Sequence, residues 1–213
     1  MLFDLQSPHR RRAVRVVFGG LALVFAISFV FLGVGTGGGG FSFSDLFGGG
    51  GGGSSSSAFD DQINAAEKQL QLNPNDTAAL ASLVQLHYSA AVQNVNSDGT
   101  LNSDGEEQLR ESADAWNKYV KVSKGNLQAT PSLYALQAFD TLASVDFQKA
   151  RTDTSTTDAL TDVNSAVDDW KSAAQAQQAL ISNQPNKNPA ASYTRLAQYL
   201  YLAGDTQGGD QAA

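Results

Sequence analysis

Few side chains of this 213-residue sequence could do chemistry, and the supply of cysteine and histidine limits it most. The chain has no cysteine, which excludes a disulfide framework, a thiol nucleophile and any metal site built on cysteine ligands. Its two histidines are His9, in a basic N-terminal stretch, and His87. His87 shares one face of an expected helix with Leu80, Leu83 and Val84. We therefore expect a core histidine with a hydrogen-bonded ring, and not a metal ligand or general base.

One loop has part of a calcium-binding pattern. Residues 94–99 read Asn-Val-Asn-Ser-Asp-Gly, which follows the start of an EF-hand loop, including glycine at position six. Position twelve, which needs a bidentate carboxylate, is Gly105, and the carboxylate of Glu106 comes one place late. Asparagine and glycine also favour turns in any protein. The pattern therefore predicts a loop that joins two helices, with calcium binding at residues 94–106 as the alternative.

Acid–base and phosphate chemistry have equally little support. Asp168 and Asp169 could act as an acid–base pair, but no second motif surrounds them, so we expect a solvated helix surface. The polyglycine at 48–53 lacks the Lys-Ser/Thr ending of a phosphate-binding loop. The chain has 14 Lys and Arg against 21 Asp and Glu, and such an acidic protein repels nucleic acid. We expect no catalytic residue, no cofactor and no bound metal, and a protein that is not an enzyme.

The charges divide the chain into a basic head and an acidic body. Residues 1–35 carry four arginines against Asp4, a balance of +3, whereas the remainder has a balance of −10. The uncharged run 16–35 follows the arginines, and its 20 residues span about 30 Å as a helix, which matches the hydrocarbon core of a bilayer. The positive-inside rule then predicts a cytoplasmic tail at 1–15 and an extracytoplasmic body.

A cleaved signal peptide and a buried core helix are the alternatives to this membrane anchor. A signal peptide needs an apolar core of about 7–15 residues and a small-residue cleavage site, whereas this run is longer and is followed by glycines and Phe41. A core helix would need a neighbouring domain to cover it on all sides. We therefore expect a single-pass transmembrane helix at 16–35 in a cell membrane.

The anchor is followed by a linker and then by a body with helical periodicity. Residues 36–57 are rich in glycine and serine, and a coil of 22 such residues has a reach of about 25 Å. From Ala58 to Ala213 no stretch alternates with period two, so the body is expected to be all-α. The first expected helix begins after Ser57 and ends at Asn73-Pro74, and the second begins near Asp76. The third lies between Ser103 and Gly125, and the fourth between Thr130-Pro131 and the break at 152–156. Apolar residues from Ala159 onward mark the fifth, and the sixth lies between Asn188-Pro189 and Gly204.

Related pieces recur along the body at the spacing of a helical hairpin. Trp116 and Trp170 lie 54 residues apart, and Leu80 and Leu133 lie 53 apart. Apolar periodicity places both tryptophans in the core before any ligand groove. The recurring pieces are 80–87, 133–140 and 193–200 in the first helices and 112–116 and 166–170 in the second helices.

These pieces resemble a degenerate version of the tetratricopeptide-repeat family. The signature glycine and tyrosine of the first helix are missing, and the two helices of a repeat are 16 or 17 residues further apart than in the family. The resemblance implies a short right-handed solenoid of about three antiparallel helical hairpins at 58–213. Its last repeat matches best at 202–205 and stops before a full second helix, so we expect a partner or a further segment to cap it.

The layout as a whole resembles the bacterial ancillary subunits of the Sec translocon, which hold a tetratricopeptide domain outside the membrane. The resemblance implies a membrane-tethered scaffold or chaperone-type adaptor of the cell envelope that binds protein or peptide partners. A small-ligand or calcium sensor is the alternative, and an enzyme is a weaker one. The first helices would present the partner-binding side chains Gln85, Tyr134, Gln137, Gln198 and Tyr201.

Overall fold

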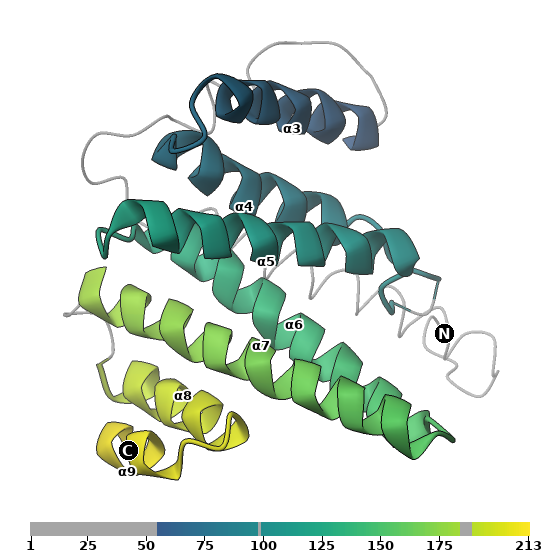
Figure 1. Cartoon of the computed structure of the whole chain (residues 1–213), viewed down its shortest axis with the longest axis vertical. Coiled ribbons are helices and arrows are strands. Elements are labelled where there is room, and N and C mark those ends of the chain that lie inside the picture. The colour runs from purple at the N-terminus through teal and green to yellow at the C-terminus, as the bar shows by residue number, and fades with distance from the viewer. Residues whose placement is uncertain (1–54, 98, 184–188) are drawn as a thin grey trace, which may run out of the picture.

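The computed structural model describes residues 55–97, 99–183 and 189–213, and this part of the chain is all-α. Figure 1 shows its helices, and within the described residues there is no β-strand, only one isolated bridge between Val95 and Leu101. The helices are α3 (Ser55–Leu72), α4 (Thr77–Ala91), α5 (Ser103–Ser123), α6 (Ala129–Thr152), α7 (Thr156–Asn183), α8 (Pro189–Leu202) and α9 (Thr206–Ala212).

Several helix ends lie where the sequence predicts them, for local reasons. Helix α3 ends at Leu72, directly before Asn73-Pro74. Asp76 caps α4, because its carboxylate accepts hydrogen bonds from the N–H groups of Ala78 and Ala79 at 2.9 and 3.0 Å. After α5, Gly125 has a φ of 88°, in the left-handed region that glycine tolerates best.

Two predicted helix starts are displaced. Asn102, and not Ser103, caps α5, since its side-chain oxygen accepts the N–H of Gly105 at 2.8 Å. Helix α6 begins at Ala129, so Pro131 occupies its third position, where a missing N–H costs no hydrogen bond within the helix. The N-cap residue Gln128 makes no side-chain capping bond, and its N–H donates to the Tyr119 hydroxyl at 3.0 Å.

Both ends of the body also differ from the prediction. Helix α3 begins at Ser55, inside the range 36–57 that is predicted as linker, so Ser57 lies within the helix and does not cap it. At the other end, α9 is a short helix that the sequence pattern does not indicate. Asp205 caps it by accepting the N–H of Gly208 at 2.8 Å. The sequence does not indicate this helix because it contains Gly208 and Gly209, and glycine is a poor helix former.

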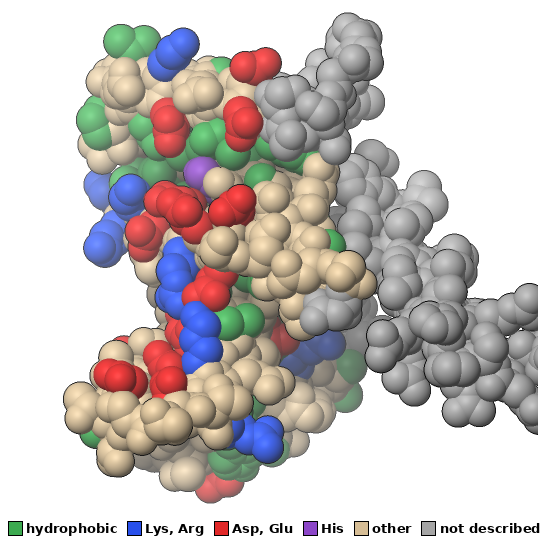
Figure 2. Space-filling model, turned by 90° about the vertical axis from the view of Figure 1, so that its right-hand side faces the viewer, with side chains coloured by type: hydrophobic (Ala, Val, Ile, Leu, Met, Phe, Trp, Pro, Cys, Tyr) green, Lys and Arg blue, Asp and Glu red, His purple; other side chains and the backbone are tan. Residues whose placement is uncertain are grey.

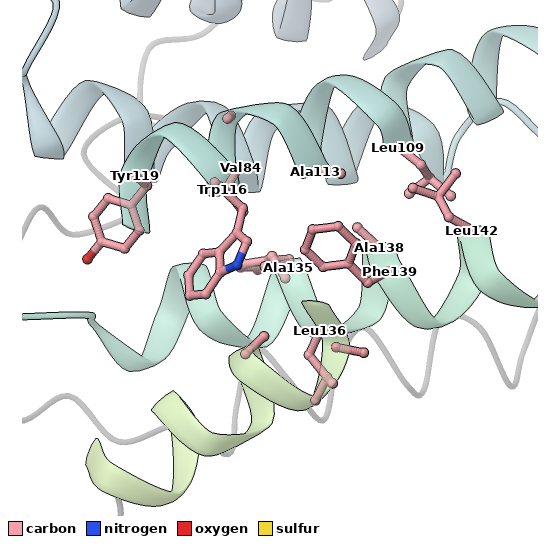
Figure 3. Packing of buried hydrophobic residues seen from close by; sticks show 14 of the residues in the cluster. Val84, Leu109, Ala113, Trp116, Tyr119, Ala135, Leu136, Ala138, Phe139 and Leu142 are labelled. Atoms are coloured by element: carbon pink, nitrogen blue, oxygen red, sulfur yellow. The ribbon is translucent and has the colours of Figure 1, made fainter. Parts of the chain in front are cut away.

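The helices pack in chain order. Each contacts the next along the chain, and α4 also contacts α6. Successive helices run in roughly opposite directions, with α5 and α7 in front of α6 (Figure 1). One apolar core joins them, and Trp116 lies at its centre, fully buried between α5 and α6 beside Ala135 (Figure 3). Burying a side chain of this size stabilises the fold by several kcal/mol.

The other core expectations for named residues are confirmed. Trp170 is 8% exposed and packs against Phe147, with ring centroids 5.8 Å apart. His87 is 6% exposed, and its Nδ1 hydrogen-bonds to Oε1 of Gln108 at 2.8 Å. A buried, bonded imidazole is the outcome that its place on the apolar stripe predicts.

Three predicted segments fall mainly or wholly outside the described residues. They are the basic tail at 1–15, the transmembrane helix at 16–35 and the linker at 36–57, apart from the first turn of α3. Among the helices that the structure describes, none combines the length and hydropathy needed to cross a bilayer.

Candidate binding surfaces

A polar stripe runs across three alternate helices, α4, α6 and α8. On α4 the spacing of three residues puts Gln85 and Tyr88 on one side, and the same spacing aligns Gln137 and Asp140 on α6. Side-chain contacts join these helices to one another. We call this stripe the α4–α6–α8 face, and its members are Gln85, Tyr88, Gln137, Asp140, Arg195, Gln198 and Tyr199.

A tyrosine pair links α4 to α6 at one end of this face. The rings of Tyr88 and Tyr134 lie 5.4 Å apart and are tilted by 52°. Such a tilted pair adds about 0.5–1.5 kcal/mol to the burial of its rings. Burial, followed by the charge of Tyr134, raises the pKa of Tyr88 to about 12, and burial also raises that of Tyr134. Both hydroxyls are therefore neutral at physiological pH and serve only as hydrogen-bonding groups.

A carboxylate links α6 to α8 at the other end. Asp140 hydrogen-bonds with Tyr199, and it also interacts electrostatically with Arg195. Burial raises the pKa of the Asp140 carboxyl, although the Tyr199 hydrogen bond and the Arg195 charge oppose the rise. Burial and the Asp140 charge raise the pKa of Tyr199 to about 12. Arg195 and part of Asp140 are exposed to solvent, so the face offers a cation and a partly buried carboxyl group to a partner.

The five partner-binding residues expected from the sequence do not all lie together. Gln85 and Gln137 are half-buried on the α4–α6–α8 face, and Gln198 is exposed one turn from Arg195. Tyr134, expected to have an exposed side, is only 8% exposed because Tyr88 packs against it.

Tyr201 lies one turn from Gln198 but about 200° around α8 from Tyr199, and its side chain contacts α9. Its ring covers Gly209, where an added Cβ would meet the ring at 2.6 Å, and its hydroxyl donates to Asp210 at 2.7 Å. Tyr201, which is 43% exposed, therefore packs against α9 and links it to α8.

The sequence expectation missed four members of the face, for an identifiable reason. It selected Gln85, Gln137 and Gln198 as polar positions of first helices but did not extend the stripe along each helix. One turn from these glutamines lie Tyr88, Asp140 and Arg195, and Tyr199 lies one turn from Arg195. The available signal was polar residues repeating at i and i+3 on each first helix.

A second surface is a groove between α3 and α5, floored by α4. Its volume is about 300 Å³. Figure 2 shows the corresponding side of the molecule, where hydrophobic side chains and a histidine lie between the uppermost helix and a charged region below it. The lining residues are Glu67, Leu70, Gln71, Leu80, Leu83, His87, Glu111, Ala115 and Lys118.

An ion cluster ties α5 to α6. Arg110 donates to Glu106 and to Asp146, at 3.0 Å in each case, and Lys149 pairs with both carboxylates, lying 3.7 Å from Asp146. The Asp146 side chain is only 3% exposed. Burial alone would raise the pKa of Glu106, but the hydrogen bonds and charges of Lys149 and Arg110 hold it below its usual value. Figure 2 shows a row of Lys and Arg side chains with carboxylates beside them on this side of the molecule.

Asp169 on α7 corrects the expectation of a solvated acidic pair. Its neighbour Asp168 is exposed and pairs with Lys171 at 2.8 Å. Asp169 is half-buried instead, close to the ion cluster. Burial, followed by the charge of Asp146, raises the pKa of Asp169 to about 7, despite the opposing charge of Arg110. Adjacent helix residues point about 100° apart, which is why one carboxylate faces water and the other faces α6.

The loop between α4 and α5 uses its asparagines to hold its own backbone. Nδ2 of Asn94 donates to the Ala90 carbonyl at 3.0 Å, and Nδ2 of Asn96 donates to Thr100 and to the Leu101 carbonyl. Gly105 lies in the first turn of α5. Among the described residues, no group of three or more His, Asp or Glu side chains could hold a metal ion. These contacts are those of a loop that joins two helices.

No protein-family model, curated protein or solved structure matches the chain.

Proposed function

We propose that this protein is a membrane-tethered, extracytoplasmic scaffold or chaperone-type adaptor that binds peptide or protein partners on its α4–α6–α8 face. The observation that carries the proposal is the continuity of this face across three helices, through the Tyr88–Tyr134 and Asp140–Tyr199 contacts. Half-buried glutamines and neutral tyrosines offer adaptable hydrogen bonding with little ordering cost. Asp140 and Arg195 add charge complementarity, which favours correct partners and faster encounter.

The repeat architecture that we propose for this scaffold is a short, tetratricopeptide-like solenoid. Its support is the packing order, in which each helix contacts its neighbour in the chain and the first helices α4 and α6 also contact each other. Stacked hairpins of this kind present their first helices on one continuous surface. The partly exposed polar residues of α4, α6 and α8 lie on such a surface.

The membrane tether rests on the sequence of the N-terminal segment. Four arginines precede an uncharged run of 20 residues, and residues 36–213 after it have a net charge of −10. An uncharged run of this length spans the bilayer as a helix, and the arginines hold its start on the cytoplasmic side. The acidic body favours basic or cationic unfolded segments as partners.

Protease access tests the proposed orientation. A protease added outside intact spheroplasts is expected to remove the body and leave an N-terminal tag protected, because the arginines retain that end in the cytoplasm. Immunoblotting for tags at both ends measures the result, and permeabilised spheroplasts are the control in which both tags are lost. A protected C-terminal tag on intact spheroplasts contradicts the proposal.

Site-specific crosslinking tests the proposed face. A photo-crosslinking residue at Gln137 is expected to capture partners in native membranes, whereas the same residue at exposed Asn117 on α5 captures far fewer. Asp140→Lys should reduce capture from position 137 by about tenfold, because it reverses the charge that a cationic partner meets. The matched control, Asp114→Lys on α5, makes the same charge change away from the face. Equal loss in both variants, with unchanged melting temperatures, would show that net charge and not the face governs binding.

A further inference from the structure

The groove between α3 and α5 lies on a different side of α4 from the proposed partner-binding face. Leu80, Leu83 and His87 recur along α4 at spacings of three and four residues and form the groove floor. Gln85 and Tyr88 lie about 140° further around the same helix. The groove is therefore a second surface, and what binds there can be tested separately from the proposed function.

The floor of the groove is apolar. Leu80, Leu83 and Ala115 are 1%, 6% and 5% exposed, and Leu70 of α3 forms a half-buried wall. An apolar side chain in the groove would gain about 25 cal/mol for each Å² of this apolar surface that it buries.

The polar groups around the floor are mostly acceptors. Glu67 of α3 and Glu111 of α5 are exposed on opposite sides of the groove, and Lys118 is the one cation of the lining. His87 also lies in the lining, where its Nδ1 hydrogen-bonds to the side-chain oxygen Oε1 of Gln108 at 2.8 Å. The two carboxylates complement a ligand that is cationic.

The size of the groove favours a side chain over a free small ligand. Small-molecule sites range from about 300 to 1,000 Å³ and enclose most of the ligand, so this groove is at the lower limit. One or two side chains of a peptide fill such a space while the peptide backbone continues along the rim. The glutamates on that rim are then placed to pair with neighbouring side chains of the same peptide.

We propose that the α3–α5 groove is a docking site for peptide segments in which a leucine- or phenylalanine-sized side chain lies beside an arginine or lysine. The apolar side chain contacts Leu80, Leu83 and Ala115, and the cationic side chain pairs with Glu67 or Glu111. This site goes beyond the proposed function, since it adds a second contact with a defined side-chain preference on the opposite part of α4. Two weak sites on one body raise the overall affinity for a partner that reaches both.

Three labelled eight-residue peptides test the proposal against the full chain in neutral-lipid nanodiscs, by fluorescence anisotropy with empty nanodiscs subtracted. Their central sequences are Leu-Arg-Leu-Lys, Leu-Glu-Leu-Glu and Ser-Arg-Ser-Lys. The first is expected to bind at least about tenfold more tightly than the other two, because it alone supplies both the apolar and the cationic groups. Equal binding of the serine peptide would overturn the role of the apolar floor, and no binding of the leucine–arginine peptide would overturn the site.

Charge reversal on the rim separates the groove from the general acidity of the body. Glu67→Lys combined with Glu111→Lys should weaken the leucine–arginine peptide by at least about tenfold. The matched control is Asp61→Lys with Asp158→Lys, two exposed carboxylates outside the lining, and it should change binding by less than about twofold. Circular dichroism confirms that both variants fold. An equal loss in the control variant overturns the proposal, whereas Asp140→Lys is expected to leave this peptide unaffected even if the α4–α6–α8 face binds nothing.

Discussion

Replacing Trp116 with alanine is expected to lower the free energy of unfolding by about 3–5 kcal/mol. Trp116 is fully buried, and its ring packs beside Tyr119, with centroids 5.6 Å apart, and over Ala135 of α6 (Figure 3). Truncation leaves a cavity at the contact between α5 and α6, where the neighbouring alanines have no side chain long enough to fill it. Domains of this size are stable by only about 5–15 kcal/mol, so urea unfolding followed by circular dichroism will detect the loss readily.

Two further variants show whether packing is the cause. Asn117→Ala, at the exposed neighbouring position, should change stability by less than about 0.5 kcal/mol. Trp116→Phe should cost clearly less than the alanine variant, since the indole Nε1 of Trp116 has no hydrogen-bond acceptor among the described residues and its removal leaves no partner unpaired. A phenylalanine variant as unstable as the alanine variant would contradict this account, because it would assign the indole nitrogen an essential bond.

Local signals account for most of the fold that the sequence predicts. Helix α4 begins after Asp76 because a short side chain with two acceptors caps the backbone there. At the displaced start of α5 the side chain of Asn102, and not that of Ser103, caps the backbone, and before α6 the N–H of Gln128 donates to the hydroxyl of Tyr119, nine residues upstream. A contact at that distance in sequence cannot be inferred from capping preferences.

The surfaces are less predictable than the helices because they depend on how one helix lies against another. The periodicity of α7 places Asp168 and Asp169 on neighbouring directions, but only the packing of α7 on α6 decides which carboxylate is buried. Tyr134 shows the same limit, since Tyr88 of another helix covers it. The groove between α3 and α5 also depends on helix packing, because its lining residues come from three helices, α3, α4 and α5.

The second large effect is expected at the ion cluster. Arg110→Met should lower the free energy of unfolding by about 2–4 kcal/mol, because it removes the main partner of the buried Asp146 carboxylate. Breaking a buried ion pair costs about 3–5 kcal/mol. We expect a somewhat smaller loss here because Lys149 remains 3.7 Å from Asp146. Methionine keeps the aliphatic length of the arginine, which separates loss of charge from loss of packing. Lys171→Met, at an exposed pair, is the matched control and should cost less than about 1 kcal/mol.

Asp169 makes this part of the fold sensitive to pH. Its pKa is 3.8 in a model peptide and about 7 in the folded protein, where burial and the Asp146 charge disfavour ionisation. The folded protein therefore keeps a proton that the unfolded chain releases. The resulting stabilisation is fully present below pH 3.8 and is lost as the pH rises through about 7. Asp169→Asn removes this dependence on pH. The free energy of unfolding of the variant, relative to that of the wild type, should therefore rise by about 1–2 kcal/mol from pH 5 to pH 8, after allowance for solvent screening.

The two substitutions are expected to interact, because Arg110 offsets the charge that Asp146 and Asp169 concentrate between α6 and α7. In the Arg110→Met background at pH 8, Asp169→Asn should recover more stability than it adds to the wild type. A double-mutant cycle of urea unfolding at pH 5 and pH 8 measures this coupling. Glu106 loses its stabilising contribution as the pH falls. Each comparison is between proteins with and without Asp169→Asn in the same background, so this loss is common to both and cancels in the difference between their free energies of unfolding. Additive effects at both pH values would contradict the electrostatic account, since they would mean that Asp169 does not respond to the charges of α5 and α6.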